Sequence, residues 1–234
     1  MADGDVIPWH THDHAQLIYS GSGLMRVDST VGAWVVPPAR AVWVPSGIAH
    51  QVIAVGAVDM RAVYLEPEAA AGLPEACRVL GVSPLLRELV AAAMALPDDY
   101  SVDGPEARLV AVLIDQLRAE PAEQLHLPMP RDRCLRVVSD ALVADPADPR
   151  ALQAFAAVAG ASARTLARRF VAETGLTFGA WRQQLRLHEA LARLAQGEPV
   201  TTVSFAVGYD SPSAFIAMFR KMLGTTPGRY LGRS

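Results

Sequence analysis

Short apolar runs broken by turn residues fill the chain from about Ala15 to Leu65. Glycine, proline and serine separate runs that are rich in Val, Ile, Trp and Tyr, at 16–19, 24–28, 33–36, 40–44, 50–55 and 60–65. Segments of this length, composition and spacing are typical of strands in a small β-sandwich or barrel. We therefore predict an all-β domain over residues 1–66.

The pattern changes after Pro67, where apolar residues begin to recur at helical spacing and predict two helices, over 83–96 and 105–119. Because a small sandwich cannot cover the apolar faces of both helices, we expect the segment 67–126 to pair two subunits as a homodimer, the commonest assembly. Two prolines then interrupt His126–Pro130, so residues 127–131 are predicted to form a linker.

Beyond Arg131 the periodic segments are helical, and one arrangement occurs twice. An apolar face over 152–159 ends at Gly160 before a helix opens at Ser162, and 203–207 ends at Gly208 before a helix opens at Ser211. This order, a short helix, a glycine turn and a second helix with aromatic residues on its inner face, is typical of a helix-turn-helix unit. Ordinary helical bundles also contain glycine turns. The repeat favours a DNA-binding domain over residues 132–234.

A predicted helix over 178–195 separates the two units. At 1.5 Å per residue it is roughly 27 Å long, close to the ~34 Å repeat of the major groove. One subunit is therefore expected to place two recognition helices in adjacent major grooves on one face of the DNA.

The distribution of charge supports this division. Up to Pro130 the chain holds 7 basic and 16 acidic residues, a net charge of −9, whereas the remainder holds 14 basic and 8 acidic residues, a net charge of +6. All basic residues except Lys221 are arginine, whose planar fork of donors suits phosphates and guanine edges. The basic half is expected to bind duplex DNA, and the acidic half to serve another purpose.

These residues resemble the AraC/XylS family of bacterial transcription regulators. The likeness to the two helix-turn-helix units of that family runs through 165–170, 173–175, 181–182, 186–187, 190–191, 208–209, 213–215, 219–220 and 226–227 to Tyr230. The first part is similar to the cupin-like sensor domain of these regulators, on His10–His12 and Pro45–His50. The whole chain looks most similar to the subgroup typified by the regulator of a 2-nitroimidazole exporter.

The resemblance implies an α+β chain of two domains that acts as a one-component transcription regulator. A cupin-like β-domain with its helical segment would bind a small-molecule effector, which the sequence does not identify. The all-α domain with two helix-turn-helix units would bind DNA.

In the first unit, the resemblance carries base reading over to Arg164, Ala167 and Arg168. Their i, i+3, i+4 spacing places them on one face of the helix, away from Leu166 and Phe170. A guanidinium can donate two hydrogen bonds to O6 and N7 of guanine, worth ~1–3 kcal/mol of discrimination. A surface salt bridge is the alternative for Arg168.

Arg169 points elsewhere and is expected to contact a phosphate or a carboxylate. In the second unit, Phe215 and Phe219 are predicted to face the core. The exposed positions carried over as DNA contacts are then poor in donors, and comprise Pro212, Ser213, Ile216 and Ala217. This helix should contact thymine methyls or phosphates and read the DNA more weakly, or its apolar face could instead contact another helix.

Near the N-terminus, His10-x-His12-x3-Gln16 with a later His50 resembles the cupin metal motif, with Gln where that family usually has Glu. Imidazoles with one oxygen ligand suit a divalent Zn, Ni, Fe or Mn ion. A polar sensor pocket, or merely exposed histidines, is the alternative. Four strand aromatics could line a ligand cavity or form core: Tyr19, Trp34, Trp43 and Tyr64.

Other functional classes find little support. The two cysteines lack CxxC spacing, which argues against a disulfide framework, a zinc ribbon and a redox motif. No apolar run reaches the about 20 residues of a membrane span, and the N-terminus does not resemble a signal peptide, so a cytoplasmic protein is expected. Nothing resembles a nucleophile elbow or a phosphate loop. A metal-dependent cupin enzyme with a helical appendage is the alternative to a non-enzymatic regulator.

Overall fold

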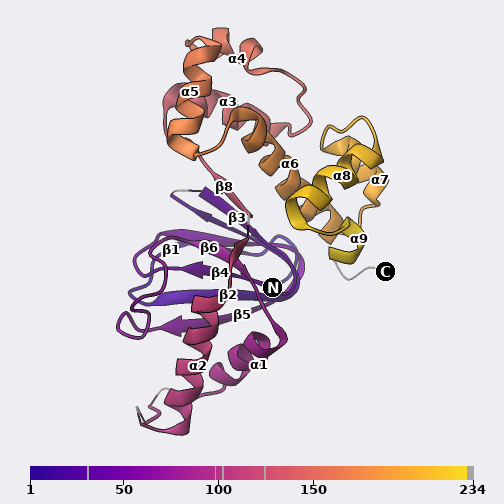
Figure 1. The fold of residues 1–234 in the computed structure, drawn as a ribbon. Helices are drawn as coiled ribbons and strands as arrows, with labels where there is room; N and C mark the ends of the chain where they lie inside the picture. Colours follow the sequence, from indigo (N-terminus) through magenta and orange to yellow (C-terminus); the bar gives the residue numbers. More distant parts are fainter. Residues whose placement is uncertain (31, 98, 102, 124, 231–234) are drawn as a thin grey trace. The chain divides into compact units, whose positions relative to one another are not determined.

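The computed structural model describes residues 1–230 except 31, 98, 102 and 124 (Figure 1). The last four residues of the predicted DNA-binding domain, 231–234, lie outside the described part. The chain divides into a first unit of residues 1–30 and 34–125 and a second unit of 126–234 with 31–33. A β-rich unit followed by a helical unit confirms the predicted fold class.

The strands form one sheet in the order β1-β5-β2-β4-β6-β7, with β3 pairing with both β2 and β8. The pairs β1–β5, β2–β4, β2–β5, β4–β6 and β6–β7 are antiparallel. The strands are β1 (Val6–His10), β2 (Ala15–Ser29), β3 (Gly32–Val36), β4 (Arg40–Val44), β5 (His50–Leu65), β6 (Arg78–Gly81), β7 (Ala122–Glu123) and β8 (His126–Pro128).

β2 and β5 are each longer than the sequence indicated, because glycines that were expected to end strands lie inside them. Their register shifts between Ser20 and Leu24, and Gly23 there has a φ of 75°. A Cβ on Gly23 would collide with the carbonyl oxygen of Ala57 on β5. Glycine therefore forms an irregularity within a continuous strand pair rather than a turn between strands.

Two helices, α1 (Pro84–Ala93) and α2 (Pro105–Ala119), follow within the predicted helical segment. They bury apolar side chains such as Leu86 and Leu113 in the same core as Leu17 and Val63 of the sheet. Besides these two helices, the predicted helical segment 67–126 contains β6 and β7, which pair with the sheet. Four- and two-residue strands are too short to show a period in sequence.

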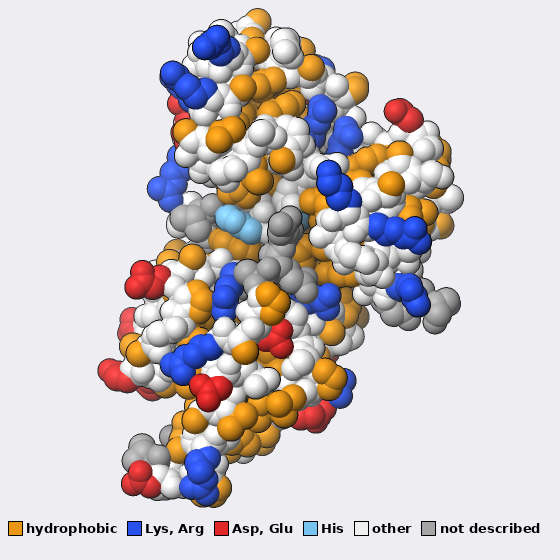
Figure 2. Space-filling model, in the orientation of Figure 1, with side chains coloured by type: hydrophobic (Ala, Val, Ile, Leu, Met, Phe, Trp, Pro, Cys, Tyr) orange, Lys and Arg blue, Asp and Glu red, His pale blue; other side chains and the backbone are white. Residues whose placement is uncertain are grey.

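The second unit contains the helices α3 (Arg133–Ala144), α4 (Leu152–Ala159), α5 (Ala163–Thr174), α6 (Phe178–Ala195), α7 (Val200–Ala206), α8 (Pro212–Leu223) and α9 (Pro227–Tyr230). α6 has the predicted bounds. Arginine and lysine side chains are spread over this unit on the face drawn in Figure 2. Among the described residues, no helix is long and apolar enough to cross a bilayer.

Residues 127–131 are not a free linker. Leu127 is buried in the core of the helical unit, together with residues of α3 to α6. The indole Nε1 of Trp181 donates a hydrogen bond of 2.7 Å to the carbonyl oxygen of Pro128. The two prolines prevent a helix here, as expected, but side chains of distant helices hold the extended chain in place.

Candidate nucleic-acid interface and sensor site

The first helix-turn-helix unit consists of α4, a turn and α5. α4 ends at Gly160, whose φ of 67° is in the left-handed region that glycine adopts without strain. The Oγ of Ser162 caps α5 by accepting a 3.2 Å hydrogen bond from the backbone N–H of Thr165. Leu166 and Phe170 are fully buried, as predicted, so the opposite face of α5 is left to solvent.

That opposite face carries the residues to which base reading was assigned. Arg164, Ala167 and Arg168 are all exposed. Neither guanidinium forms an ion pair or a hydrogen bond with any residue in the described part of the chain. The predicted alternative of a surface salt bridge at Arg168 is therefore not what the structure shows. Two adjacent cations without partners leave this face available to an anionic or acceptor-rich surface.

Arg169 has a different role. Its Nη1 lies 2.8 Å from Oδ2 of Asp132, and Asp132 caps α3 by accepting from the backbone N–H of Cys134. Of the two expected partners for Arg169, phosphate or carboxylate, this structure provides the carboxylate. The ion pair ties α5 to the start of α3, and a contact of Arg169 with DNA stays a prediction.

Glu173 ties α5 to the same segment of chain. Its Oε2 accepts hydrogen bonds from the backbone N–H groups of Arg131, at 2.7 Å, and Asp132, at 3.0 Å. The sequence pattern gave Glu173 no role beyond its place in a motif, because its partners lie about 40 residues away in the chain. The recognition helix is thus anchored to the segment that enters the helical unit.

The second unit consists of α7, a turn and α8, and its turn is more crowded. Gly208 has a φ of 81°. Arg186 of α6 donates from Nη1 to the carbonyl oxygen of Gly208, at 3.0 Å, and from Nε to that of Pro146, at 2.9 Å. Burial, and then the charge of Arg182, lower the pKa of Arg186, but arginine remains protonated in proteins. A half-buried cation therefore fastens the second turn to the α3–α4 loop.

α8 begins like α5 but exposes other chemistry. The Oγ of Ser211 accepts a 3.2 Å hydrogen bond from the backbone N–H of Ala214, and Phe215 and Phe219 are fully buried, as predicted. Of the four predicted contact residues on α8, Ser213 and Ala217 are exposed, whereas Pro212 and Ile216 are half-buried. The head of this helix offers one hydroxyl group and no cation.

Two cations on α8 were not predicted as DNA contacts. Arg220 and Lys221 lie in its last turn, are exposed and have no partner among the described residues. Arg220 is seven positions after Ser213, and therefore lies two turns further along the same side of the helix. This spacing is visible in the sequence and could have identified Arg220.

In the first unit, three histidines form a cluster. His10 ends β1, His50 begins β5 directly opposite it in the strand register, and His12 follows β1. The ring centroids are 4.3 Å apart for His10 and His50, 4.7 Å for His10 and His12, and 5.5 Å for His12 and His50. His12 lies in the loop that follows β1 rather than in the strand itself. The structure nevertheless brings all three rings together.

Gln16 joins this cluster through its amide group. Its Oε1 lies 3.1 Å from Nε2 of His50, and its Nε2 donates to the hydroxyl oxygen of Tyr64 at 3.0 Å. Burial lowers the pKa of His50, and burial followed by the positive charge of neighbouring histidines lowers the pKa of His12. Both imidazoles are thereby favoured in the neutral form, which has a lone pair available for coordination.

His14 is not part of this cluster. It is exposed and pairs with Glu66, with Nε2 and Oε1 3.0 Å apart. The sequence motif also left it without a role. It therefore provides an internal control for histidines that are merely close to the surface.

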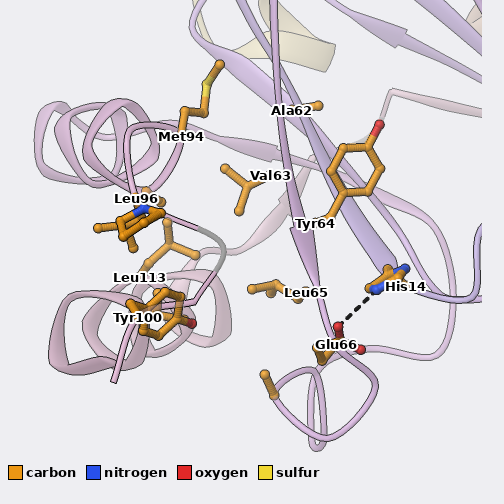
Figure 3. Close-up of a pocket in the computed structure, with 14 residues that line it drawn as sticks. His14, Ala62, Val63, Tyr64, Leu65, Glu66, Met94, Leu96, Tyr100 and Leu113 are labelled. Carbon is orange, nitrogen blue, oxygen red and sulfur yellow. Dashed lines mark hydrogen bonds and ion pairs between the residues drawn. The ribbon is translucent and has the colours of Figure 1, made fainter. Parts of the chain in front are cut away.

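A cavity of about 610 Å³ lies where β5 faces α1 and α2 (Figure 3). Val63 and Leu65 point into it from the strand, and Met94 and Leu113 lie on the helical side. The four strand aromatics were predicted either to line a ligand cavity or to form core, and the structure shows both. Three of the four aromatics are buried core residues: Tyr19, Trp34 and Trp43. Tyr64 is among the residues that line the cavity, and its ring also contacts that of His12, with ring centroids 5.2 Å apart.

Comparison with known protein families divides the chain in the same way. Residues 1–129 match the model of the AraC-like ligand binding domain, and residues 155–233 match a helix-turn-helix domain. The chain is 38% identical over 226 residues, 97% of its own length and 82% of the relative's, to the HTH-type transcriptional regulator NimR of Escherichia coli.

Two further similarities are more limited, the first in coverage and the second in sequence identity. The HTH-type transcriptional regulator RipA of Corynebacterium glutamicum is 38% identical over 103 residues, 44% of this chain and 31% of that protein. Among solved structures, ToxT from Vibrio cholerae aligns with 100% of this chain and 96% of its own, at 10% identity and a TM-score of 0.43.

Proposed function

This chain belongs to the AraC family of transcription regulators, with a ligand-binding domain before a helix-turn-helix domain, and on that premise we propose how it reads DNA. In our proposal each subunit contacts two successive major grooves. α5 reads base edges, and α8 mainly follows the backbone and the shape of the DNA. Regulation takes place in the cytoplasm and depends on a small molecule bound by the first unit.

The observation that carries this proposal is the pair of partnerless guanidinium groups on α5. Arg164 and Arg168 are exposed on the face opposite the buried Leu166 and Phe170. A bidentate contact of arginine with guanine discriminates by ~1–3 kcal/mol against the wrong base. Ala167, between them on the same face, is small enough to allow close approach of the helix to the groove and to contact a thymine methyl.

α8 supports a different kind of contact. Ser213 and Ala217 offer a hydroxyl and a methyl group, with the half-buried Pro212 and Ile216 beside them. The exposed Arg220 and Lys221 are suited to phosphates, which position a protein on DNA without reading its sequence. α6, with 18 residues between the two units, is ~27 Å long, near the major-groove repeat of ~34 Å.

The first unit is suited to an effector that is mainly apolar. Its cavity between β5, α1 and α2 is lined largely by aliphatic side chains, and the lining residues with polar groups are His14, Tyr64, Glu66 and Tyr100. Pockets of this size and composition are typical of small-molecule sites. The lining therefore predicts the polarity of the effector.

We also propose that α1 and α2 pair two subunits. Leu85 of α1 and Val112 of α2 are about half exposed, at 53% and 45%. Apolar groups on the outer faces of two helices are what a homodimer would cover. Sedimentation at micromolar concentration, with and without a DNA site, should show a dimer. A monomer under both conditions would contradict this part.

The decisive experiment selects duplexes from a random library with the full-length protein and then titrates the enriched duplex at several salt concentrations. We expect one well-defined base cluster, a weaker cluster ~10–10.5 base pairs away, and a log–log salt dependence of ~0.9 for each phosphate contact. Absence of an enriched sequence, or affinity that does not vary with salt, would overturn the proposal.

A further inference from the structure

The histidine cluster of the first unit has the arrangement of a metal site, which lies beyond the proposed DNA reading. The sheet register sets His10 opposite His50, and the loop after β1 returns His12 to the same place. One nitrogen from each of the three rings lies within 4.8 Å of the other two. Three segments of chain thus deliver three potential ligand atoms to one point.

The hydrogen bonds of two rings fix which nitrogen is available. Nδ1 of His10 lies 2.6 Å from the carbonyl oxygen of Pro8, and Nδ1 of His50 lies 2.9 Å from that of Ile48. A carbonyl oxygen only accepts, so Nδ1 of His10 carries the proton and its Nε2 keeps a lone pair. At His50 both nitrogens face acceptors, since Nε2 lies 3.1 Å from Oε1 of Gln16. Its Nε2 becomes a ligand atom when it gives up the side-chain contact and Nδ1 keeps the backbone one. Imidazoles that bind metals usually donate their other N–H group to a carbonyl or carboxylate in this way.

The third ring supplies an independent observation. Nε2 of His12 is shielded from solvent and has no hydrogen-bond partner among the described residues. A buried polar atom without a partner is uncommon in a folded protein and calls for an explanation such as an ion or a water molecule. A metal ion bound by Nε2 of all three histidines would satisfy this atom.

We propose that His10, His12 and His50 bind one divalent transition metal ion through their Nε2 atoms. Neutral imidazoles select Zn²⁺, Ni²⁺, Co²⁺ or Cu²⁺ over Mg²⁺ and Ca²⁺, which require oxygen ligands. At zinc–nitrogen distances of ~2.0–2.1 Å the rings must close in slightly. Nε2 of His50 must exchange its contact with Gln16 for the metal.

Gln16 is a positioning residue in this proposal. Its amide lies between His50 and Tyr64 and holds the His50 ring from the side of β2. A carboxylate at position 16 would bring a negative charge to the ion, whereas glutamine brings none. A bound ion would therefore keep its full charge and a coordination position open to water or to an anionic or nitrogen-donating small molecule.

The test uses full-length protein without a polyhistidine tag, and Zn²⁺, Co²⁺ and Mg²⁺ salts as probes. Calorimetry should show one Zn²⁺ per chain and none for Mg²⁺, and Co²⁺ should give the visible absorption of a four- or five-coordinate nitrogen site. Zn²⁺ should also raise the Tm. His12→Gln should weaken Zn²⁺ binding by ~100-fold or more, since even outer-shell changes cost ~10–100-fold.

Two further variants keep the outcome interpretable. His50 is almost fully buried, at 1% exposure, so His10→Gln, at a half-buried position, is the second ligand variant and should behave like His12→Gln. His14→Gln removes a neighbouring exposed histidine and should leave affinity and spectrum unchanged. The proposal would be overturned if the protein bound no Zn²⁺. It would also be overturned if His14→Gln abolished binding while His12→Gln and His10→Gln kept it. Neither result depends on DNA binding.

Discussion

The two helix-turn-helix units share one scaffold and differ in the chemistry that they expose. Each places a glycine with positive φ in its turn, at Gly160 and Gly208. Each caps its second helix with a serine that accepts from the backbone N–H three residues on, at 3.2 Å. In each, two fully buried side chains four positions apart fix the second helix to its core.

The exposed positions separate the two units. α5 presents Arg164 and Arg168 near its start, whereas α8 has Ser213 and Ala217 at its head and its cations only in the last turn. These positions contribute little to the core, so they can vary without altering the helix. Two similar helix-turn-helix scaffolds can therefore expose different side chains to the DNA.

The turns also differ in their surroundings. A Cβ on Gly160 would meet no atom within 4 Å, whereas one on Gly208 would lie 2.9 Å from Cα of Ala147 and 2.6 Å from Nη2 of Arg186. The first turn needs glycine for its backbone conformation alone. The second also needs the space, because α6 and the α3–α4 loop press against it.

The largest expected effect concerns the reading surfaces. Replacing Arg164 and Arg168 together by alanine should remove ~1–3 kcal/mol of base discrimination per arginine, so that binding to the selected duplex approaches binding to a scrambled one. The matched variant replaces Arg220 and Lys221 by alanine. It should weaken binding to both duplexes alike and reduce the salt slope by roughly 0.9 for each phosphate that the variant no longer neutralises.

Anisotropy titrations of both variants on both duplexes make this comparison. If the α5 variant loses affinity equally on the two duplexes, its arginines contact phosphates and the distinction between the units fails. Loss of discrimination in the α8 variant would mean that its last turn reads bases.

The second prediction compares the turns. Gly208→Ala should lower the free energy of unfolding by ~2–5 kcal/mol, the sum of left-handed strain of ~1–2 kcal/mol and overpacking of ~1–3 kcal/mol. Gly160→Ala should cost only the strain, ~1–2 kcal/mol. Urea unfolding followed by circular dichroism measures both. Equal losses would show that Arg186 and the α3–α4 loop move aside without cost.

The smallest effect tests what the units share. Ser162→Ala and Ser211→Ala each remove a side-chain cap and should lower the free energy of unfolding by similar amounts, ~1 kcal/mol. The same urea experiment applies, with Ser162→Asp and Ser211→Asp as variants that retain an acceptor. A large difference between the two alanine variants would mean that the scaffolds are not equivalent.

Much of the helical unit follows from sequence alone. The long α6 has its predicted bounds because its apolar residues repeat with the helical period over 18 residues. Residues that typically begin and end helices flank it. Thr177 caps its start, and Gly197 and Pro199 follow its end. Leu166, Phe170, Phe215 and Phe219 could be placed inside for the same reason. Local periodicity determines which face of a helix is buried.

The sheet was less predictable because strand pairing depends on partners far apart in the chain. No local pattern distinguishes Gly23, inside a continuous strand, from a glycine in a turn. β6 is four residues long and becomes a strand only because β4 offers an edge. A short strand forms by pairing with neighbouring strands, so its own sequence predicts it poorly.

The candidate sites divide along the same line. Sequence by itself determined that arginines share one face of α5 and that histidines recur near the N-terminus, since residue type and spacing are local properties. Only the tertiary structure decided that Arg169 finds Asp132 while Arg164 and Arg168 find no partner among the described residues. It alone set His50 opposite His10. Such pairings join residues about 40 positions apart, and chain folding, rather than helical or strand period, brings their side chains together.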